Sequence, residues 1–94
     1  MDLTFTEAER AFRQSIEVSR EVGNRRQEGP LLCLFANLLL ETGRGEESRR
    51  TWQEGAALLR QCGAFEELGI QSAAMREHCE KAGIPPHEEA AGER

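Results

Sequence analysis

Two histidines and three cysteines are the residues of this sequence whose side chains could carry nucleophilic or metal chemistry. His78 and Cys79 are adjacent, and neighbouring side chains on a helix point about 100° apart, so these two cannot form a nucleophile–base pair by themselves. His87 stands beside Glu88 and Glu89, a cluster that would bind a metal only weakly. The sequence has no Gly-rich phosphate loop, nucleophile elbow or zinc motif. It therefore predicts a protein that is not an enzyme, with no catalytic, cofactor-binding or metal-binding residues and no cofactor.

The cysteines do not form a disulfide framework. Cys33, Cys62 and Cys79 are an odd number, and none belongs to a C-x-x-C pair. We expect reduced thiols that act as small core residues.

Charge and hydropathy exclude two classes of partner. The formal net charge is −5, and the arginines alternate with glutamates instead of clustering, which argues against a nucleic-acid surface. The most apolar stretch, LLCLFANLLL at 31–40, is flanked by Glu28 and Glu41 and is too short to cross a membrane, which takes about 20 residues. The opening MDLTFTEAER lacks the basic start of a signal peptide. We expect a cytoplasmic protein that binds neither nucleic acid nor membrane.

Apolar residues recur at steps of three or four throughout, which is typical of amphipathic helices. The pattern predicts an all-α chain with helices at about 4–22, 25–42, 46–62 and 64–82, a folded domain over 1–84 and a disordered tail over 85–94. Pro30 leaves two alternatives for the second helix: it begins near Gly29, or it is kinked there. The stripes expected to face inward end with Val22 in the first helix and begin with Phe65 in the fourth.

The chain contains an internal repeat. Gly23, Gly29 and Gly43 recur 40 residues later as Gly63, Gly69 and Gly83, and the same shift aligns Phe12 with Trp52. A common offset for helix ends and large apolar residues indicates the duplication of a helix pair.

The middle copy resembles the tetratricopeptide repeat, in the long-helix variety with a 40-residue period. The residues that carry the resemblance are Leu32, Phe35, Ala36, Leu39, Gly43, Ser48 and Trp52. It covers about residues 6–83 and implies antiparallel helix-turn-helix repeats stacked as a short solenoid of about four helices. Two positions depart from the family: Gly55 replaces the usual alanine, and Arg76 stands where a small residue is preferred.

The resemblance implies a concave groove that holds a peptide or a helix of a partner protein. The groove-facing positions would be Cys33, Asn37 and Leu40 from one repeat and Ala73, Glu77 and Glu80 from the next. Asn37 falls where family members use asparagine to bind the backbone of a ligand. The basic residues that clamp a terminal carboxylate are missing, and Glu77 and Glu80 favour a basic or neutral ligand.

The end helices raise an alternative. Because each lacks the neighbour that a longer stack would supply, apolar residues off their main stripes could be covered by a homodimer, by an adjacent domain or by the rest of a longer protein. These candidate assembly residues are Phe5, Ala11, Val18, Ile70 and Ala74. The sequence thus predicts a non-enzymatic protein-interaction module, with an assembly element that docks through its end helices as the alternative.

Overall fold

Four α-helices form the part of the chain that this computed structural model describes, residues 3–87, with side chains described from Phe5 onward. They are α1 (Leu3–Glu21), α2 (Arg25–Glu41), α3 (Gly45–Gln61) and α4 (Phe65–Ala82). This part of the chain contains no strand, so the all-α prediction is confirmed. Each helix boundary lies within one residue of its predicted position.

Each of these helices ends at a glycine in the left-handed region. Gly23, Gly43, Gly63 and Gly83 have φ between 71° and 78°, a conformation that costs a residue with a Cβ about 1–2 kcal/mol. After each glycine the next N–H turns back to the last helical turn, as in the bond of 2.9 Å from the Ala64 nitrogen to the Leu59 carbonyl oxygen. Since these glycines are evenly spaced, the same turn recurs after every helix and produces the repeat read from the sequence.

Helix α2 begins earlier than the first alternative for Pro30 predicted. The Asn24 side chain accepts a hydrogen bond of 3.2 Å from the Gln27 amide and so caps a helix that starts at Arg25. Pro30 therefore lies inside the helix and cannot donate to the Arg26 carbonyl.

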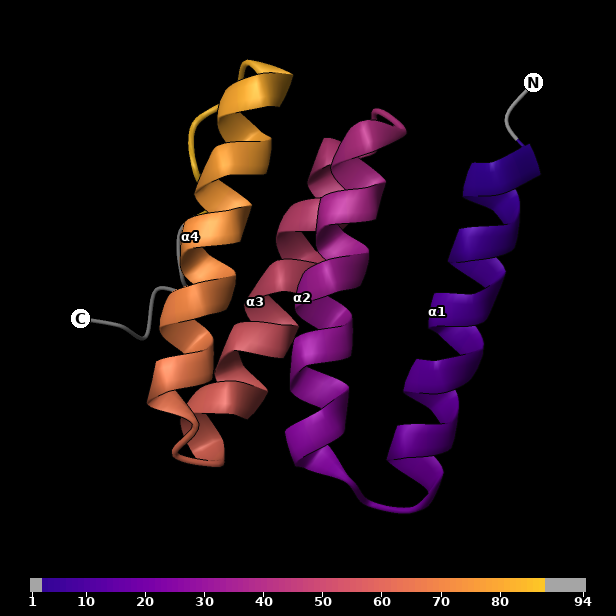
Figure 1. The fold of residues 1–94 in the computed structure, drawn as a ribbon, viewed down its shortest axis with the longest axis vertical. Coiled ribbons are helices and arrows are strands. Elements are labelled where there is room, and N and C mark those ends of the chain that lie inside the picture. The colour runs from indigo at the N-terminus through magenta and orange to yellow at the C-terminus, as the bar shows by residue number, and fades with distance from the viewer. Residues whose placement is uncertain (1–2, 88–94) are drawn as a thin grey trace.

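Helix α2 is the centre of the fold. Figure 1 shows it between α1 and α4, with α3 packed behind it. Its inward residues join both hydrophobic clusters of the core. Cys33, Ala36 and Leu40 pack with Trp52 and other residues of α3 and α4. In the second cluster, Leu32, Phe35 and Leu39 of α2 pack with Ile16 of α1.

The closest approach in the core is the crossing of α2 and α3. A Cβ built on Gly55 would lie 2.8 Å from the Gly29 carbonyl oxygen, 2.9 Å from the Cys33 sulfur and 2.9 Å from the Leu32 Cβ. Gly55 thus has no room for the alanine that tetratricopeptide repeats prefer at the position it resembles. The absence of a side chain lets the two backbones touch.

This crossing predicts opposite effects for two glycine-to-alanine changes. Gly55→Ala should lower the free energy of unfolding by about 1–3 kcal/mol, because the methyl group forces the helices apart. Gly69→Ala should raise it by about 0.5–1 kcal/mol, because Gly69 is the repeat equivalent of Gly29, lies mid-helix and has open space around it. Urea denaturation of both variants checks this, and equal destabilisation by the two changes would contradict the crossing.

Candidate interaction surfaces

The six residues predicted to line a groove do not share one accessible surface. Cys33, Asn37 and Leu40 are buried, with exposed fractions of 1%, 6% and 7%. Their repeat equivalents, Ala73, Glu77 and Glu80, are exposed on α4. The cause is the number of neighbours, because α3 and α4 pack around α2, whereas no further helix of the described chain covers α4. These positions are where repeats stack, and the groove prediction is corrected accordingly.

The five candidate assembly residues fall on the two end helices with different burial. Ala11 and Val18 are exposed on α1 and Ile70 is exposed on α4, whereas Phe5 and Ala74 are half-buried. Val22 and Phe65, which the helical stripes predicted to face inward, are also exposed. Both stripes fail in the last or first turn of an end helix, where the adjacent helix of the stack is missing.

One end of the molecule presents an apolar surface, which we call the N-terminal face. It includes Val18 and Val22, 52% and 69% exposed, and Leu34, 43% exposed. Half-buried Leu31 and Leu38 lie on the same stripe of α2 as Leu34. The full set comprises Ala11, Ser15 and Val18 of α1, Val22 in the turn after it, and Leu31, Leu34 and Leu38 of α2.

The repeat shows what such a face receives. Shifted by one period, the first four residues become Thr51, Gly55 and Leu58 of α3 and its C-cap Cys62, and the α2 residues become Gln71, Ala74 and His78 of α4. In α3 and α4, two of these positions lie against α2. Gly55 adjoins Gly29, and the His78 Nε2 lies 3.8 Å from a Glu41 carboxylate oxygen. The N-terminal face is therefore the equivalent of a surface that α2 covers elsewhere in the same molecule.

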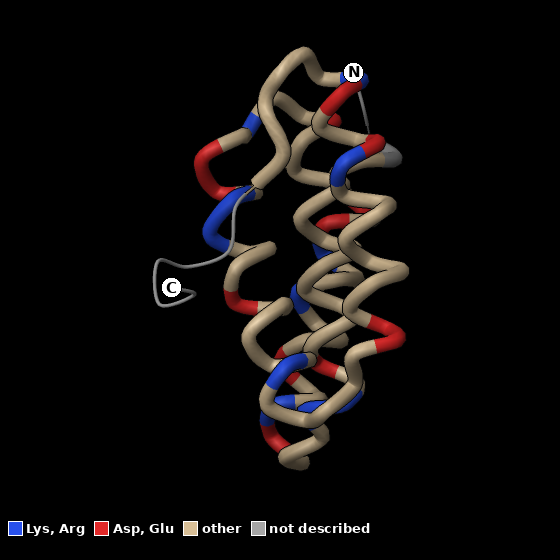
Figure 2. The backbone as a smooth tube through the Cα atoms, turned by 90° about the vertical axis from the view of Figure 1, so that its left-hand side faces the viewer, with Lys and Arg blue, Asp and Glu red and all other residues tan. Residues whose placement is uncertain are grey.

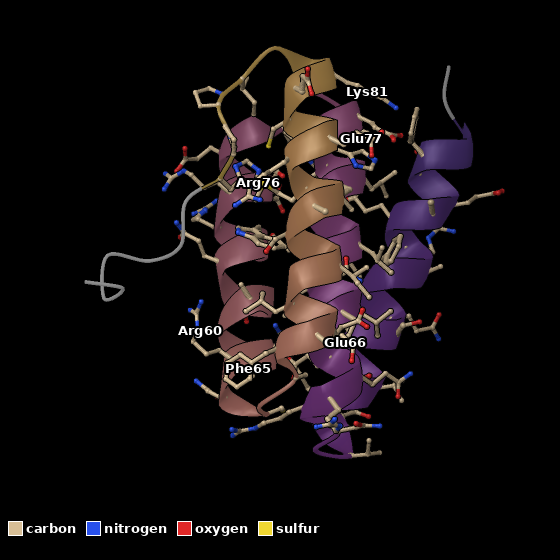
Figure 3. The ribbon with its side chains drawn as sticks, turned by 60° about the vertical axis from the view of Figure 1, so that its left-hand side comes forward. Arg60, Phe65, Glu66, Arg76, Glu77 and Lys81 are labelled. Carbon is tan, nitrogen blue, oxygen red and sulfur yellow. The ribbon has the colours of Figure 1, made fainter. Side chains whose placement is uncertain are left out.

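The opposite end carries charged residues on α4, together with the exposed apolar Phe65 and Ile70. Its surface, the C-terminal face, consists of Gly69, Ala73, Arg76, Glu77 and Glu80 of α4. Arg76 and Glu80 stand where α2 has the core residues Ala36 and Leu40. Figure 3 shows Arg76 and Glu77 projecting from opposite edges of α4, and Figure 2 shows acidic and basic positions interspersed along this side. A polar outer surface is typical of the helix that ends a stack.

A short C-terminal segment, Ile84–His87, closes part of this end. After Gly83 the chain turns back beside α4 (Figure 1), and the segment borders Gly45, Arg49 and Gln53 of α3. By the repeat these positions correspond to Phe5, Glu9 and Arg13 of α1, and Glu9 and Arg13 contact the start of α3. The segment thus fills the place where the first turn of a following helix would lie.

His87 anchors the segment, which corrects the prediction that the chain is disordered from residue 85. Its side chain is 6% exposed, and its Nε2 lies 3.0 Å from the Ser48 hydroxyl oxygen. Because Ser48 donates its own proton to the Ala36 carbonyl, the His87 ring donates to Ser48. Burial, together with the nearby Arg49, lowers the pKa of His87 below its ordinary value of 6.5. Residues 88–94 of the predicted tail, including Glu88 and Glu89, lie outside the described part.

Ion pairs hold α1 against the rest of the stack. Arg44, in the α2–α3 turn, makes two bonds of 2.9 Å to Glu9, and Arg13 bridges Glu9 and Glu47. Hydrogen bonds from Arg44 and then Arg13 lower the pKa of Glu9 to about 2. Arg20 similarly links Glu28 and Glu54. These ion pairs therefore hold α1, which carries part of the N-terminal face, against α2 and α3.

These bridges also border a cavity of about 520 Å³ between α1 and α3. Its floor includes the buried Ile16, Leu32 and Phe35, and its rim carries charges of both signs. The Arg13–Glu47 and Arg20–Glu54 ion pairs join the two helices across it.

The candidate chemical residues are separated or buried. Burial, followed by the charge of Glu67, raises the pKa of Cys33 to about 12, and burial also raises the pKa of Cys79, so both thiols stay protonated. The His78 Nδ1 bonds to the Ala74 carbonyl of its own helix. Within residues 3–87 no group of three histidine, cysteine or acidic residues is placed to hold a metal ion. None of the helices described is both long and apolar enough to span a membrane.

Comparison with family models, curated proteins and solved structures gives no match for this chain.

The anchoring of His87 predicts a pH-dependent stability. A folded-state pKa below 6.5 means that the unfolded chain binds the proton more readily, so stability is complete above pH 6.5 and falls as the pH drops below it. His87→Ala should cost about 1 kcal/mol at pH 7.5 through the lost hydrogen bond and should reduce the fall between pH 7 and pH 5. Denaturant titrations at several pH values measure both effects, and an unchanged pH profile in the variant would show that His87 is not the titrating group.

Proposed function

We propose that this chain is a non-enzymatic, tetratricopeptide-like interaction module that binds a helix of a partner protein on its N-terminal face. One observation carries the proposal: the apolar stripes of α1 and α2 are open at positions whose repeat equivalents border α2. Contiguous exposed apolar surface is a mark of interaction sites. The order in which α2, α3 and α4 pack, together with the glycine turns, supports the family assignment.

The location and chemistry of the site favour binding over catalysis. Its members are valine, leucine, alanine and serine, which offer burial and shape but no general acid, base or nucleophile at neutral pH. Free cysteines fit a reducing compartment, and we place the protein in the cytoplasm on that ground.

A structural element that joins copies of itself is the second candidate. Phe65 and Ile70, 61% and 59% exposed, favour it, because they add apolar surface at the other end of the stack. Arg76, Glu80 and the Ile84–His87 segment oppose it, since they place charge and a bound chain where a second copy would have to dock.

The proposal is tested by crosslinking the purified protein to its partners and then reconstituting the pair. Leu34→Glu should abolish binding of a purified partner, or weaken it at least tenfold, because a carboxylate would be buried in an apolar interface. Ile70→Glu is the matched control, since Ile70 is similarly exposed but lies at the other end, and it should leave the affinity unchanged. Binding that survives Leu34→Glu and is lost with Ile70→Glu would move the site to α4.

A further inference from the structure

The chemistry of the bound helix can be inferred from the way α2 itself meets α3. Near its start, α2 directs two arginines at the end of α3: the Arg25 Nη1 lies 3.5 Å from the Gln61 Oε1, and the Arg26 Nη1 donates to the Cys62 carbonyl at 3.2 Å. Further along, Gly29 makes the close crossing with Gly55. A helix on the N-terminal face would meet the equivalent features of α1.

The end of α1 carries a carboxylate that the end of α3 lacks. By the repeat, Glu21 replaces Gln61 and Val22 replaces Cys62, so a carboxylate stands where α3 has a neutral amide. Glu21 is exposed and makes no ion pair within the described residues. The partial negative charge at the C-terminus of α1 adds to it.

The residue at the equivalent crossing position on the N-terminal face is also small. Ser15 is the repeat equivalent of Gly55, and its Cβ would overlap a partner backbone placed at the α2–α3 distance, so the incoming helix must lie farther from α1 than α2 lies from α3. A glycine or alanine at its crossing position keeps that added distance small. Beyond this point, the valines of α1 and the leucines of α2 offer apolar contacts to one stripe of the incoming helix.

A second copy of this chain that docks head to tail does not have that chemistry. The helix it could offer is α4, which carries Phe65 and Glu66 where α2 carries Arg25 and Arg26. Docked in the repeat geometry, Glu66 would approach the acidic end of α1, and Arg76 and Glu80 would take the places of Ala36 and Leu40. Figure 3 shows Glu66 near the start of α4. Head-to-tail stacking of copies is therefore disfavoured by charge, and a foreign helix with a basic first turn fits the face better than α4 does.

We propose that the N-terminal face binds an amphipathic helix of another protein whose first turn carries arginine or lysine. These cations pair with Glu21 and with the last carbonyls of α1, a small residue crosses Ser15, and a leucine-type stripe covers Leu31, Leu34 and Leu38. This inference rests on the proposed function and adds the charge and orientation of the partner: its N-terminus lies beside the C-terminus of α1.

The test uses synthetic helices of the length of α2. Each keeps the spacing of Gly29 and of the α2 residues that face α3, with glutamine and alanine at the other positions. Three peptides differ only in the two first-turn residues at the positions of Arg25 and Arg26, which we call the head: two arginines, two glutamines or two glutamates. Fluorescence anisotropy of the labelled peptides at low salt gives the affinity for the wild type and for Glu21→Arg, with Glu66→Arg as the control at the opposite end.

We expect the arginine head to bind roughly fivefold more tightly than the glutamine head and the glutamate head to bind most weakly. Glu21→Arg should reverse this order, whereas Glu66→Arg should preserve it. Equal binding of all heads, or an order that Glu21→Arg leaves intact, would overturn the charge inference while helix docking stands. Binding that Leu34→Glu does not weaken, or no binding of any peptide, would overturn the docking face itself.

Discussion

The backbone contact between Gly29 and Gly55 determines how the helices of this protein pack. Because neither residue has a side chain, α2 and α3 approach until a single added carbon on Gly55 would overlap three atoms of α2. That closeness brings Trp52, Ala56 and Leu59 of α3 into the core and allows Ser48 to bond the Ala36 carbonyl.

The same constraint makes the two ends of the stack different. A repeat unit presents one surface to the unit before it and another to the unit after it, and both surfaces are apolar in the middle of a stack. At the C-terminal end α4 has the charged residues Arg76 and Glu80 at such positions, and the segment Ile84–His87 packs beside α3. At the N-terminal end the valines and leucines are still present. We infer that the chain's own residues cover part of the C-terminal end, whereas a partner covers the N-terminal face.

The sequence alone was enough to predict the helices, their turns and the repeat, because each depends on local chemistry. A glycine just after a helix can adopt the left-handed conformation without the cost that a Cβ adds, and Asn24 caps α2 through its near neighbour Gln27. Burial at a repeat position depends instead on how many helices lie beside it. Cys33 and Ala73 occupy equivalent positions, yet one is in the core and the other is in solvent. The burial of His87 was also missed, because Pro85, Pro86 and His87 have no helical pattern in the sequence. Only the structure shows that the His87 ring hydrogen-bonds to Ser48.

The claim that the N-terminal face is the binding surface is tested most directly by mapping where a helix binds. Backbone amide shifts of the labelled protein, titrated with the arginine-headed helix, locate the contact residue by residue. We expect the largest changes from Ser15 to Val22, in the second half of α1 and the turn after it, and along Leu31, Leu34 and Leu38 of α2. Changes concentrated on Ala73, Glu77 and Glu80 of α4 would contradict binding at the N-terminal face and would place the binding site on the C-terminal face.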